Sequence, residues 1–319
     1  MAYDLQHRLV LGVASSALFD LTESDAVFRR EGEEPYRRYQ EEHVDDQLAP
    51  GVAFGFVRRL LSLNDLGPPD DPPVEVMVLS RNDPDTGRRV MRSIASHGLG
   101  ISRAIFMQGR APYRFMKALN MSLFLSADAV NVREAVQQGY PAGQVLLSAV
   151  SDDTADGDLR IAFDFDGVLA DDAAERIYQT DGIQRFRDHE AEHATEPHGP
   201  GPLRDFLAGV NRIQQLEQQR QLADPGYRIR VHVSIVTARD APSHDRAIAS
   251  LKAWGVTVND AFFLGGIDKA RIIEVLQPHI FFEDQQRHLL GASRFAPSVH
   301  IPFGVANETP TDLEGPAAS

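Results

Sequence analysis

The chain has 319 residues, 43% of them hydrophobic, which is enough for one large domain or two medium-sized domains with proper cores. It contains no cysteine, so disulfides and thiolate metal sites are excluded and a reducing cytoplasm is the natural compartment. A formal net charge of −14 argues against binding to a nucleic acid polymer or to an anionic membrane. The net charge does not exclude a small anionic substrate, because a binding site supplies its own local cations. Nor does the composition exclude a homo-oligomer.

Strands and helices are expected to alternate through the first 150 residues, because apolar runs follow segments with helical spacing. In chain order we expect a strand at 9–14, a charged helical region at 25–46, a helix at 52–63, alternating strands and helices from 74 to about 125, a helix at 130–138 and a short strand at 145–148. Such alternation is typical of parallel βαβ units. The acidic stretch 151–158 is the best candidate for a linker to the second half.

The second half opens on an apolar segment, 159–163, that leads into Asp164 and Asp166 and then a glycine. Residues two apart on a strand point to the same side, so the two carboxylates are expected to lie on the same side of the strand. Two like charges there are costly unless a cation lies between them. A divalent metal resolves this cost and leaves one carboxylate free to attack an electrophile. Two surface aspartates at a strand end are the plainer alternative.

Three further apolar strands are predicted downstream, and each leads to a residue that suits phosphoryl transfer. Thr237 follows the first, Lys269 comes just past the second, and Glu283 and Asp284 close the third. Sites in open α/β sheets form beyond the carboxyl ends of the strands, so these groups are expected to meet. They would supply a hydroxyl donor, a cation and a metal cage. Taken singly, Thr237 could be a helix N-cap, Lys269 a solvated first-turn residue, and the acidic pair a turn.

This order of motifs resembles that of the haloacid dehalogenase-like phosphatases, and more narrowly that of the cytosolic type I 5′-nucleotidases. The narrower likeness covers about residues 9–303. It rests on segments outside the four motifs: Ala14 to Asp20, Ala174 to Phe186 with Glu175, Tyr178 and Gly182, His189–Glu190, and Gly201–Pro202–Leu203. One departure is Ser16, which stands where the family's opening Ser-Ser-Arg pattern has an arginine, so any role of that arginine is in doubt for this chain.

The resemblance implies a role for each motif residue. Asp164 would be the nucleophile that becomes an aspartyl-phosphate, and Asp166 the general acid and base. Thr237 and Lys269 would hold the phosphoryl oxygens. A carboxylate is a competent nucleophile once a metal offsets its repulsion from phosphate, which agrees with these roles.

The resemblance also implies Mg²⁺ as cofactor. The ion would lie on Asp164, on the backbone carbonyl of Asp166 and on Asp284, with Glu283 close by. Mg²⁺ prefers oxygen ligands and usually keeps some waters. Spacing alone does not decide which of Glu283 and Asp284 ligates directly, and Asp284 is favoured.

The insert at about 173–227 is longer than one crossover needs, and two helices are predicted in it. In the resembled superfamily such an insert is a cap that selects the leaving group. Tyr178, Phe186 and His189 are candidate contacts to the base or ribose, with packing inside the cap as the alternative. Arg239 is a candidate phosphate contact, with an exposed loop arginine as its alternative.

The chain is predicted to contain the same unit twice. Aligning Ser80 with Thr237 gives a constant offset of 157 residues, and the segment around Ala14 and Ser16 aligns with Asp164 and Asp166 at an offset of 150. In the first copy the carboxylates are thus replaced by Ala14 and Ser16, the lysine by Pro112, and the acidic pair by Ser126–Ala127. The first half is therefore interpreted as a degenerate copy with a structural or interface role, such as closing one side of the substrate pocket.

The predicted fold is α/β: a Rossmann-like parallel sheet with helices on both faces, a small helical cap insert and a degenerate N-terminal copy. The predicted domains are 1–150, non-catalytic, and 151–306, catalytic, followed by a polar flexible tail at 307–319. The expected function is Mg²⁺-dependent hydrolysis of nucleoside 5′-monophosphates, with purine monophosphates such as AMP implied by the resemblance. A phosphatase for another small metabolite and a nucleotide-binding regulator without turnover are the alternatives.

Overall fold

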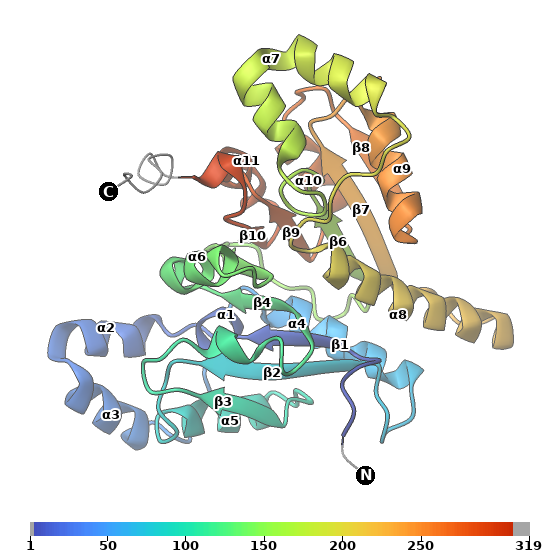
Figure 1. Ribbon diagram of the computed structural model, residues 1–319. Helices are drawn as coiled ribbons and strands as arrows, with labels where there is room; N and C mark the ends of the chain where they lie inside the picture. Colours follow the sequence, from blue (N-terminus) through green and yellow to red (C-terminus); the bar gives the residue numbers. More distant parts are fainter. Residues whose placement is uncertain (1–2, 309–319) are drawn as a thin grey trace, which may run out of the picture.

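Ten strands form one continuous sheet in the computed structural model, which describes residues 3–308 (Figure 1). Its strand order is β3-β2-β1-β4-β5-β10-β9-β6-β7-β8. The strands are β1 (Leu9–Val13), β2 (Val74–Ser80), β3 (Arg103–Phe106), β4 (Met121–Ser126), β5 (Ala142–Val145), β6 (Leu159–Phe163), β7 (Val231–Thr237), β8 (Asp260–Phe263), β9 (Ile280–Glu283) and β10 (Ser298–His300). Neighbouring strands run parallel except β5 and β10, which pair antiparallel.

The sheet consists of two five-stranded halves with the same internal order. Read outward from the β5–β10 pair, β4-β1-β2-β3 on one side matches β9-β6-β7-β8 on the other. The predicted α/β class with a mostly parallel sheet is confirmed. The strand predicted at 145–148 was placed too late, because β5 ends at Val145.

Helices cover both faces of the sheet. They are α1 (Ser15–Leu18), α2 (Thr22–Glu31), α3 (Glu33–Glu42), α4 (Phe54–Ser62), α5 (Gly87–Ser96), α6 (Ala129–Gln137), α7 (Ala173–Glu192), α8 (Arg204–Ala223), α9 (His244–Trp254), α10 (Lys269–Leu276) and α11 (Gln286–Ala292), with short 3₁₀ turns η1 (Leu63–Leu66), η2 (Pro112–Phe115) and η3 (Val305–Asn307). Over residues 3–308, none of them has both the length and the hydropathy needed to cross a bilayer.

The side chains of β1 show how the two faces are divided. Leu9, Leu11 and Val13 enter a large core under α4, α5, α8 and α9 that is shared by both halves, whereas Val10 faces a separate core under α6. This is the alternation of a strand buried on both faces. In the second half the other face is covered by α10 and α11.

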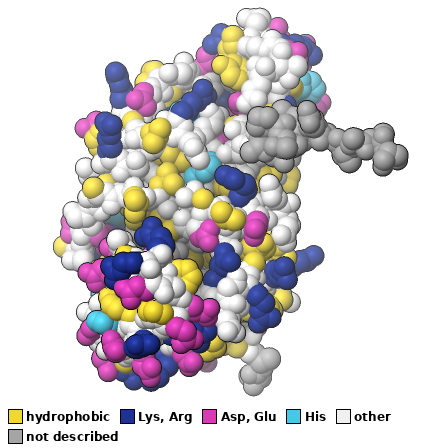
Figure 2. Space-filling view, turned by 90° about the vertical axis from the view of Figure 1, so that its left-hand side faces the viewer, with side chains coloured by type: hydrophobic (Ala, Val, Ile, Leu, Met, Phe, Trp, Pro, Cys, Tyr) yellow, Lys and Arg dark blue, Asp and Glu magenta, His cyan; other side chains and the backbone are white. Residues whose placement is uncertain are grey.

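Two helical arms project from the sheet, one from each half (Figure 1). The first consists of α2 and α3, which are separated at Gly32 (φ 86°); the second is α7, which is kinked at Gly182 (φ 80°). Positive φ favours glycine, so each arm bends at a residue suited to it. Figure 2 shows acidic and basic side chains crowded together on the face where the first arm lies.

The two helices of the predicted insert take different places. The arm α7 stands over the carboxyl ends of the second-half strands (Figure 1), whereas α8 contacts β1, β4 and η1 and buries Phe206 and Val210 in the shared core. The predicted domain boundaries stay predictions. Of the predicted tail, residues 309–319 lie outside the described residues.

Several hydrogen bonds recur at the offsets noted in the sequence. In each half an arginine donates to a backbone carbonyl in the loop that follows the arm, and a serine hydroxyl accepts a backbone N–H from the same loop. The pairs are Arg89 Nε to Asp46 O (3.1 Å) with Arg246 Nε to Glu196 O (2.9 Å), and Leu48 N to Ser93 Oγ (3.0 Å) with His198 N to Ser250 Oγ (2.9 Å). The arms are thus anchored alike, while the descent of the first half from a catalytic unit stays a prediction.

Candidate active site

The strands β6, β7 and β9 end side by side at one edge of the sheet. Phe163, the last residue of β6, pairs with Ile235 and with Phe282 on the two flanking parallel strands. This register places Asp164, Thr237 and Glu283 at the same edge, as predicted from the strand ends. Lys269 reaches the same place from the first turn of α10, which Asp268 caps by accepting the Ala270 N–H at 3.0 Å.

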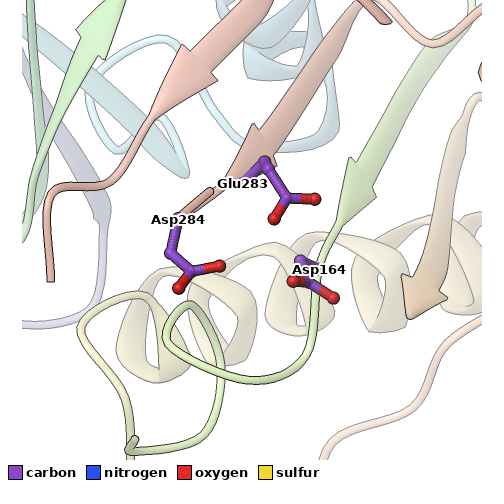
Figure 3. A group of neighbouring side chains, drawn as sticks. All are labelled: Asp164, Glu283 and Asp284. Atoms are coloured by element: carbon purple, nitrogen blue, oxygen red, sulfur yellow. The ribbon is translucent and has the colours of Figure 1, made fainter. Parts of the chain in front are cut away.

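Three buried carboxylates meet at this edge (Figure 3). Asp164, Glu283 and Asp284 each place an oxygen within 4.8 Å of the others, and they are at most 4% exposed. Oδ1 of Asp284 is buried without a hydrogen-bond partner. The loop after Asp164 passes so close that a Cβ on Gly167 would lie 2.6 Å from Asp284 Oδ2. A buried, partly unsatisfied cluster of oxygen donors suits a divalent cation such as Mg²⁺.

One ammonium lies among these carboxylates. Lys269 Nζ is 2.8 Å from Asp164 Oδ1 and 2.7 Å from Glu283 Oε2. Burial and then the charge of Glu283 raise the pKa of Asp164, and burial and then the charge of Asp164 raise the pKa of Asp284. Burial also opposes ionisation of Glu283, but Lys269 and then His288 outweigh it and lower the pKa of Glu283 to about 2. One ammonium does not balance three ionised carboxylates, so a further cation would be needed for all three to be ionised.

Thr237 is the last residue of β7 and is 1% exposed. Its Oγ1 accepts the backbone N–H of Arg239 at 3.3 Å. The N-cap of the following helix α9 is Ser243, so the alternative interpretation of Thr237 as an N-cap is wrong. Lys269 is buried, which makes its alternative as a solvated first-turn residue wrong as well.

Arg239 is buried, at 3% exposure, so the alternative of an exposed loop arginine is wrong. Its Nε and Nη2 donate to the two oxygens of Asp166 at 2.8 and 2.6 Å, and its Nη1 donates to Glu190. The guanidinium lies between the rings of Phe165 and Phe186, 5.2 and 5.4 Å from their centroids. Burial opposes the charged form, but Asp166 and then Glu190 outweigh it and raise the pKa of Arg239. Asp166 is thus held apart from the three clustered carboxylates.

A cavity of about 660 Å³ opens onto the site beneath α7. Asp164, Asp166, Thr237, Lys269 and Arg239 line it, together with Tyr178 and Phe186 from the arm. The rings of Tyr178 and Phe186 meet edge to face with centroids 6.3 Å apart. The described lining residues of this cavity all come from the second half, while Arg133 of the first half lines an adjoining hollow together with Tyr178 and Arg287. The suggestion that the first half closes one side of the pocket stays a prediction.

His189 lies differently from the other predicted substrate contacts. Its ring stacks on His193, with centroids 4.2 Å apart, and its Nδ1 is 3.3 Å from Glu190 Oε1. It is not among the residues that line the cavity. Its assignment as a substrate contact stays a prediction.

Sequence reasoning missed part of the site. Arg187 and Arg287 add two cations to the cavity lining, and His288 Nδ1 lies 3.2 Å from Glu283 Oε1. Arg287 and His288 lie in the first turn of α11, within five residues of Glu283, and that proximity is a signal that the sequence offers. The sequence marks Glu190 only through the family likeness of His189–Glu190, because the partners of its side chain are distant in the chain.

Comparisons with known proteins agree with the motifs. Residues 1–308 match the family model described as 5′-nucleotidase. Over 296 residues the chain is 31% identical to cytosolic 5′-nucleotidase 1B of Homo sapiens, covering 91% of this chain and 48% of that protein. The chain therefore spans about half the length of the curated relative. A solved haloacid dehalogenase-like hydrolase from Burkholderia xenovorans LB400 aligns at 19% identity with a TM-score of 0.26, over 50% of this chain and 90% of that one.

Proposed function

Because the chain belongs to the 5′-nucleotidase family, we propose that it is a phosphoric monoester hydrolase that converts nucleoside 5′-monophosphates to nucleoside and phosphate. The observation that carries the proposal is the meeting of Asp164, Lys269, Glu283 and Asp284 at one edge of the sheet, where Asp164 and Lys269 also line the cavity. A nucleophilic carboxylate, an adjacent ammonium and a cluster of oxygen donors are the parts that phosphoryl transfer requires.

Asp164 and Asp284 would hold Mg²⁺, with the backbone carbonyl of Asp166 as a third donor by family resemblance. Asp284 is favoured over Glu283 as the direct ligand because Glu283 is already engaged by Lys269, whereas Oδ1 of Asp284 has no partner. When bound, the cation would offset the repulsion between the phosphate and the carboxylates.

In the proposed reaction Asp164 attacks phosphorus, and the bond from phosphorus to the ester oxygen breaks. Asp166 donates a proton to that oxygen, so the nucleoside leaves with a hydroxyl group. Asp166 then takes a proton from water, which attacks the aspartyl-phosphate and regenerates the free Asp164 carboxylate with release of phosphate. Lys269 and the hydroxyl of Thr237 would hold the phosphoryl oxygens as charge develops on them.

The arm would receive the nucleoside. Phe186 and Tyr178 offer aromatic surface for a base, and the cavity of about 660 Å³ has room for a nucleoside monophosphate. AMP-like purine monophosphates are the proposed substrates, by family resemblance.

A phosphate-release assay over AMP, IMP, pyrimidine monophosphates and sugar phosphates tests the proposal. Turnover of sugar phosphates alone would favour the alternative of a phosphatase for another small metabolite. Binding of AMP without any turnover would favour the alternative of a nucleotide-binding regulatory protein. Asp164→Asn removes the nucleophile and is expected to lower kcat by about 1000-fold or more while the protein stays folded. Near-normal turnover by this variant would exclude Asp164 as the attacking group.

A further inference from the structure

Glu190 is a carboxylate on the arm that the proposed mechanism does not use. Its side chain is fully buried, and four cationic or ring groups approach it. Oε1 accepts from Arg246 Nη1 at 2.7 Å, while Oε2 lies 3.1 Å from His198 Nε2 and accepts from Nη1 of Arg239. The other two donors of the same guanidinium hold Asp166. Opposite charges thus alternate from the arm, through Arg239, to Asp166.

The geometry points to Glu190 as a positioning residue for Asp166: it fixes the Arg239 guanidinium, which in turn orients the Asp166 carboxylate toward the leaving oxygen. This inference rests on the proposed function. A planar guanidinium that binds one carboxylate through two nitrogens and another through the third has little freedom to rotate. The flanking rings of Phe165 and Phe186 restrict it further.

The first half of the chain provides an internal comparison. At the aligned positions Glu190 is replaced by Gln40, Arg239 by Asn82 and Asp166 by Ser16. The contact that docks the arm nevertheless survives, because Arg89 Nη1 donates to Gln40 Oε1 at 3.2 Å. Docking of an arm therefore does not require a carboxylate here. The carboxylate of Glu190 occurs in the half that also has Arg239 and Asp166. This co-occurrence indicates that the charge of Glu190 serves Asp166 and not the docking of the arm.

The test uses Glu190→Gln, which introduces the amide that the first half has at this position. AMP requires a proton on its leaving oxygen, whereas p-nitrophenolate leaves p-nitrophenyl phosphate without one. We expect kcat with AMP to fall about 10- to 100-fold, and the pre-steady-state release of p-nitrophenol to stay within about 3-fold of wild type, since general acid catalysis supplies factors of this size. KM for both substrates is expected to change less than about 3-fold, because ground-state binding is retained.

Two further variants complete the experiment. Arg239→Lys keeps a positive charge but cannot bridge Asp166 and Glu190, so it is expected to show the same selective loss. Gln40→Leu disturbs the docking of the first arm. It is expected to leave unchanged the ratio of the rate with AMP to the rate with p-nitrophenyl phosphate.

Equal losses on both substrates, or no loss on either, would overturn the inference. Unfolding of Glu190→Gln at the assay temperature, followed by circular dichroism, would also overturn it, because the carboxylate would then be needed for the fold. If the wild type hydrolyses neither substrate, the proposed function itself fails. If the wild type hydrolyses both substrates and Glu190→Gln leaves the ratio of the two rates unaltered, only the positioning role of Glu190 is excluded.

Discussion

The two adjacent acidic residues at the end of β9 ionise differently because their partners differ. Lys269 and His288 lie against Glu283 and lower its pKa to about 2, whereas burial and then the charge of Asp164 raise the pKa of Asp284. The motif residues could be predicted from the sequence because each follows an apolar strand. The pairing of Arg239 with Asp166 and Glu190 could not be predicted, because these are contacts of the folded chain that no local pattern marks.

At the residue scale, Asp284→Asn and Glu283→Gln are expected to have opposite effects on the metal-free protein at neutral pH. A raised carboxyl pKa means that ionisation destabilises the fold, so Asp284→Asn should raise the melting temperature. Glu283→Gln removes the partner of a buried lysine and should cost about 3 kcal/mol. Calorimetry in chelator measures both, and shifts of the same sign would contradict the assignment.

The same calorimetry with added Mg²⁺ tests whether Asp284 binds the ion. Ligand at 100 times its dissociation constant stabilises a folded protein by about 2.7 kcal/mol. The wild type should show such a rise with added Mg²⁺, whereas Asp284→Asn should show little. A full rise in the variant would remove Asp284 as a ligand.

At the scale of elements, most strands and helices could be predicted because burying one face of an element makes hydrophobic residues recur at a regular spacing in the sequence. β5 could not be placed correctly, because its sequence Ala-Gly-Gln-Val has no apolar run. Its burial comes from pairing with β4 and with β10, and a Cβ on Gly143 would lie 2.4 Å from Val299. The charged helical region at 25–46 was predicted as a whole, but its division at Gly32 depends on a backbone conformation that only the fold reveals.

The start of β6 contains a pH-sensitive junction. His279 Nδ1 accepts the Arg160 N–H at 3.0 Å, and its Nε2 lies 3.3 Å from Asp156. Burial, then the charges of Arg59 and Arg160, lower the pKa of His279 to about 4. The folded state therefore resists a proton that the unfolded chain accepts near its ordinary pKa of about 6.5, so stability is present above that pH and is lost as pH falls toward 4.

Urea titrations should show this loss as about 2 kcal/mol between pH 6.5 and 4, a value reduced for solvent screening of the partly exposed ring. His279→Gln keeps an acceptor but does not titrate, so its stability should change less over the same interval. Parallel curves for the two proteins would contradict the assignment.

At the scale of the whole molecule, the two halves share one core and one sheet. The repeat could be read from constant offsets in the sequence, but the relative placement of the halves could not. It depends on β10, near the end of the described chain, pairing antiparallel with β5. α8 strengthens the junction by packing across from the second half onto β1 and β4.

Gly209 marks a close approach of α8 to β1 in this junction, since a Cβ there would lie 2.5 Å from Leu9 Cδ1. Replacing a helical glycine ordinarily stabilises a helix, but Gly209→Val should destabilise the protein by about 1–3 kcal/mol through overpacking. Gln218→Val, at an exposed position of the same helix, is the matched control and should change stability by less than about 0.5 kcal/mol. Equal denaturation midpoints for the two variants would contradict the close packing of α8 against β1 at this position.

The antiparallel pairing of β5 with β10 sends the carboxyl ends of the two sets of strands to opposite rims of the sheet. The loop that follows β2, at residues 81–86, therefore faces away from the mouth of the cavity. A fluorophore or an affinity handle attached there would leave the mouth of the cavity unobstructed and would report on the first half alone.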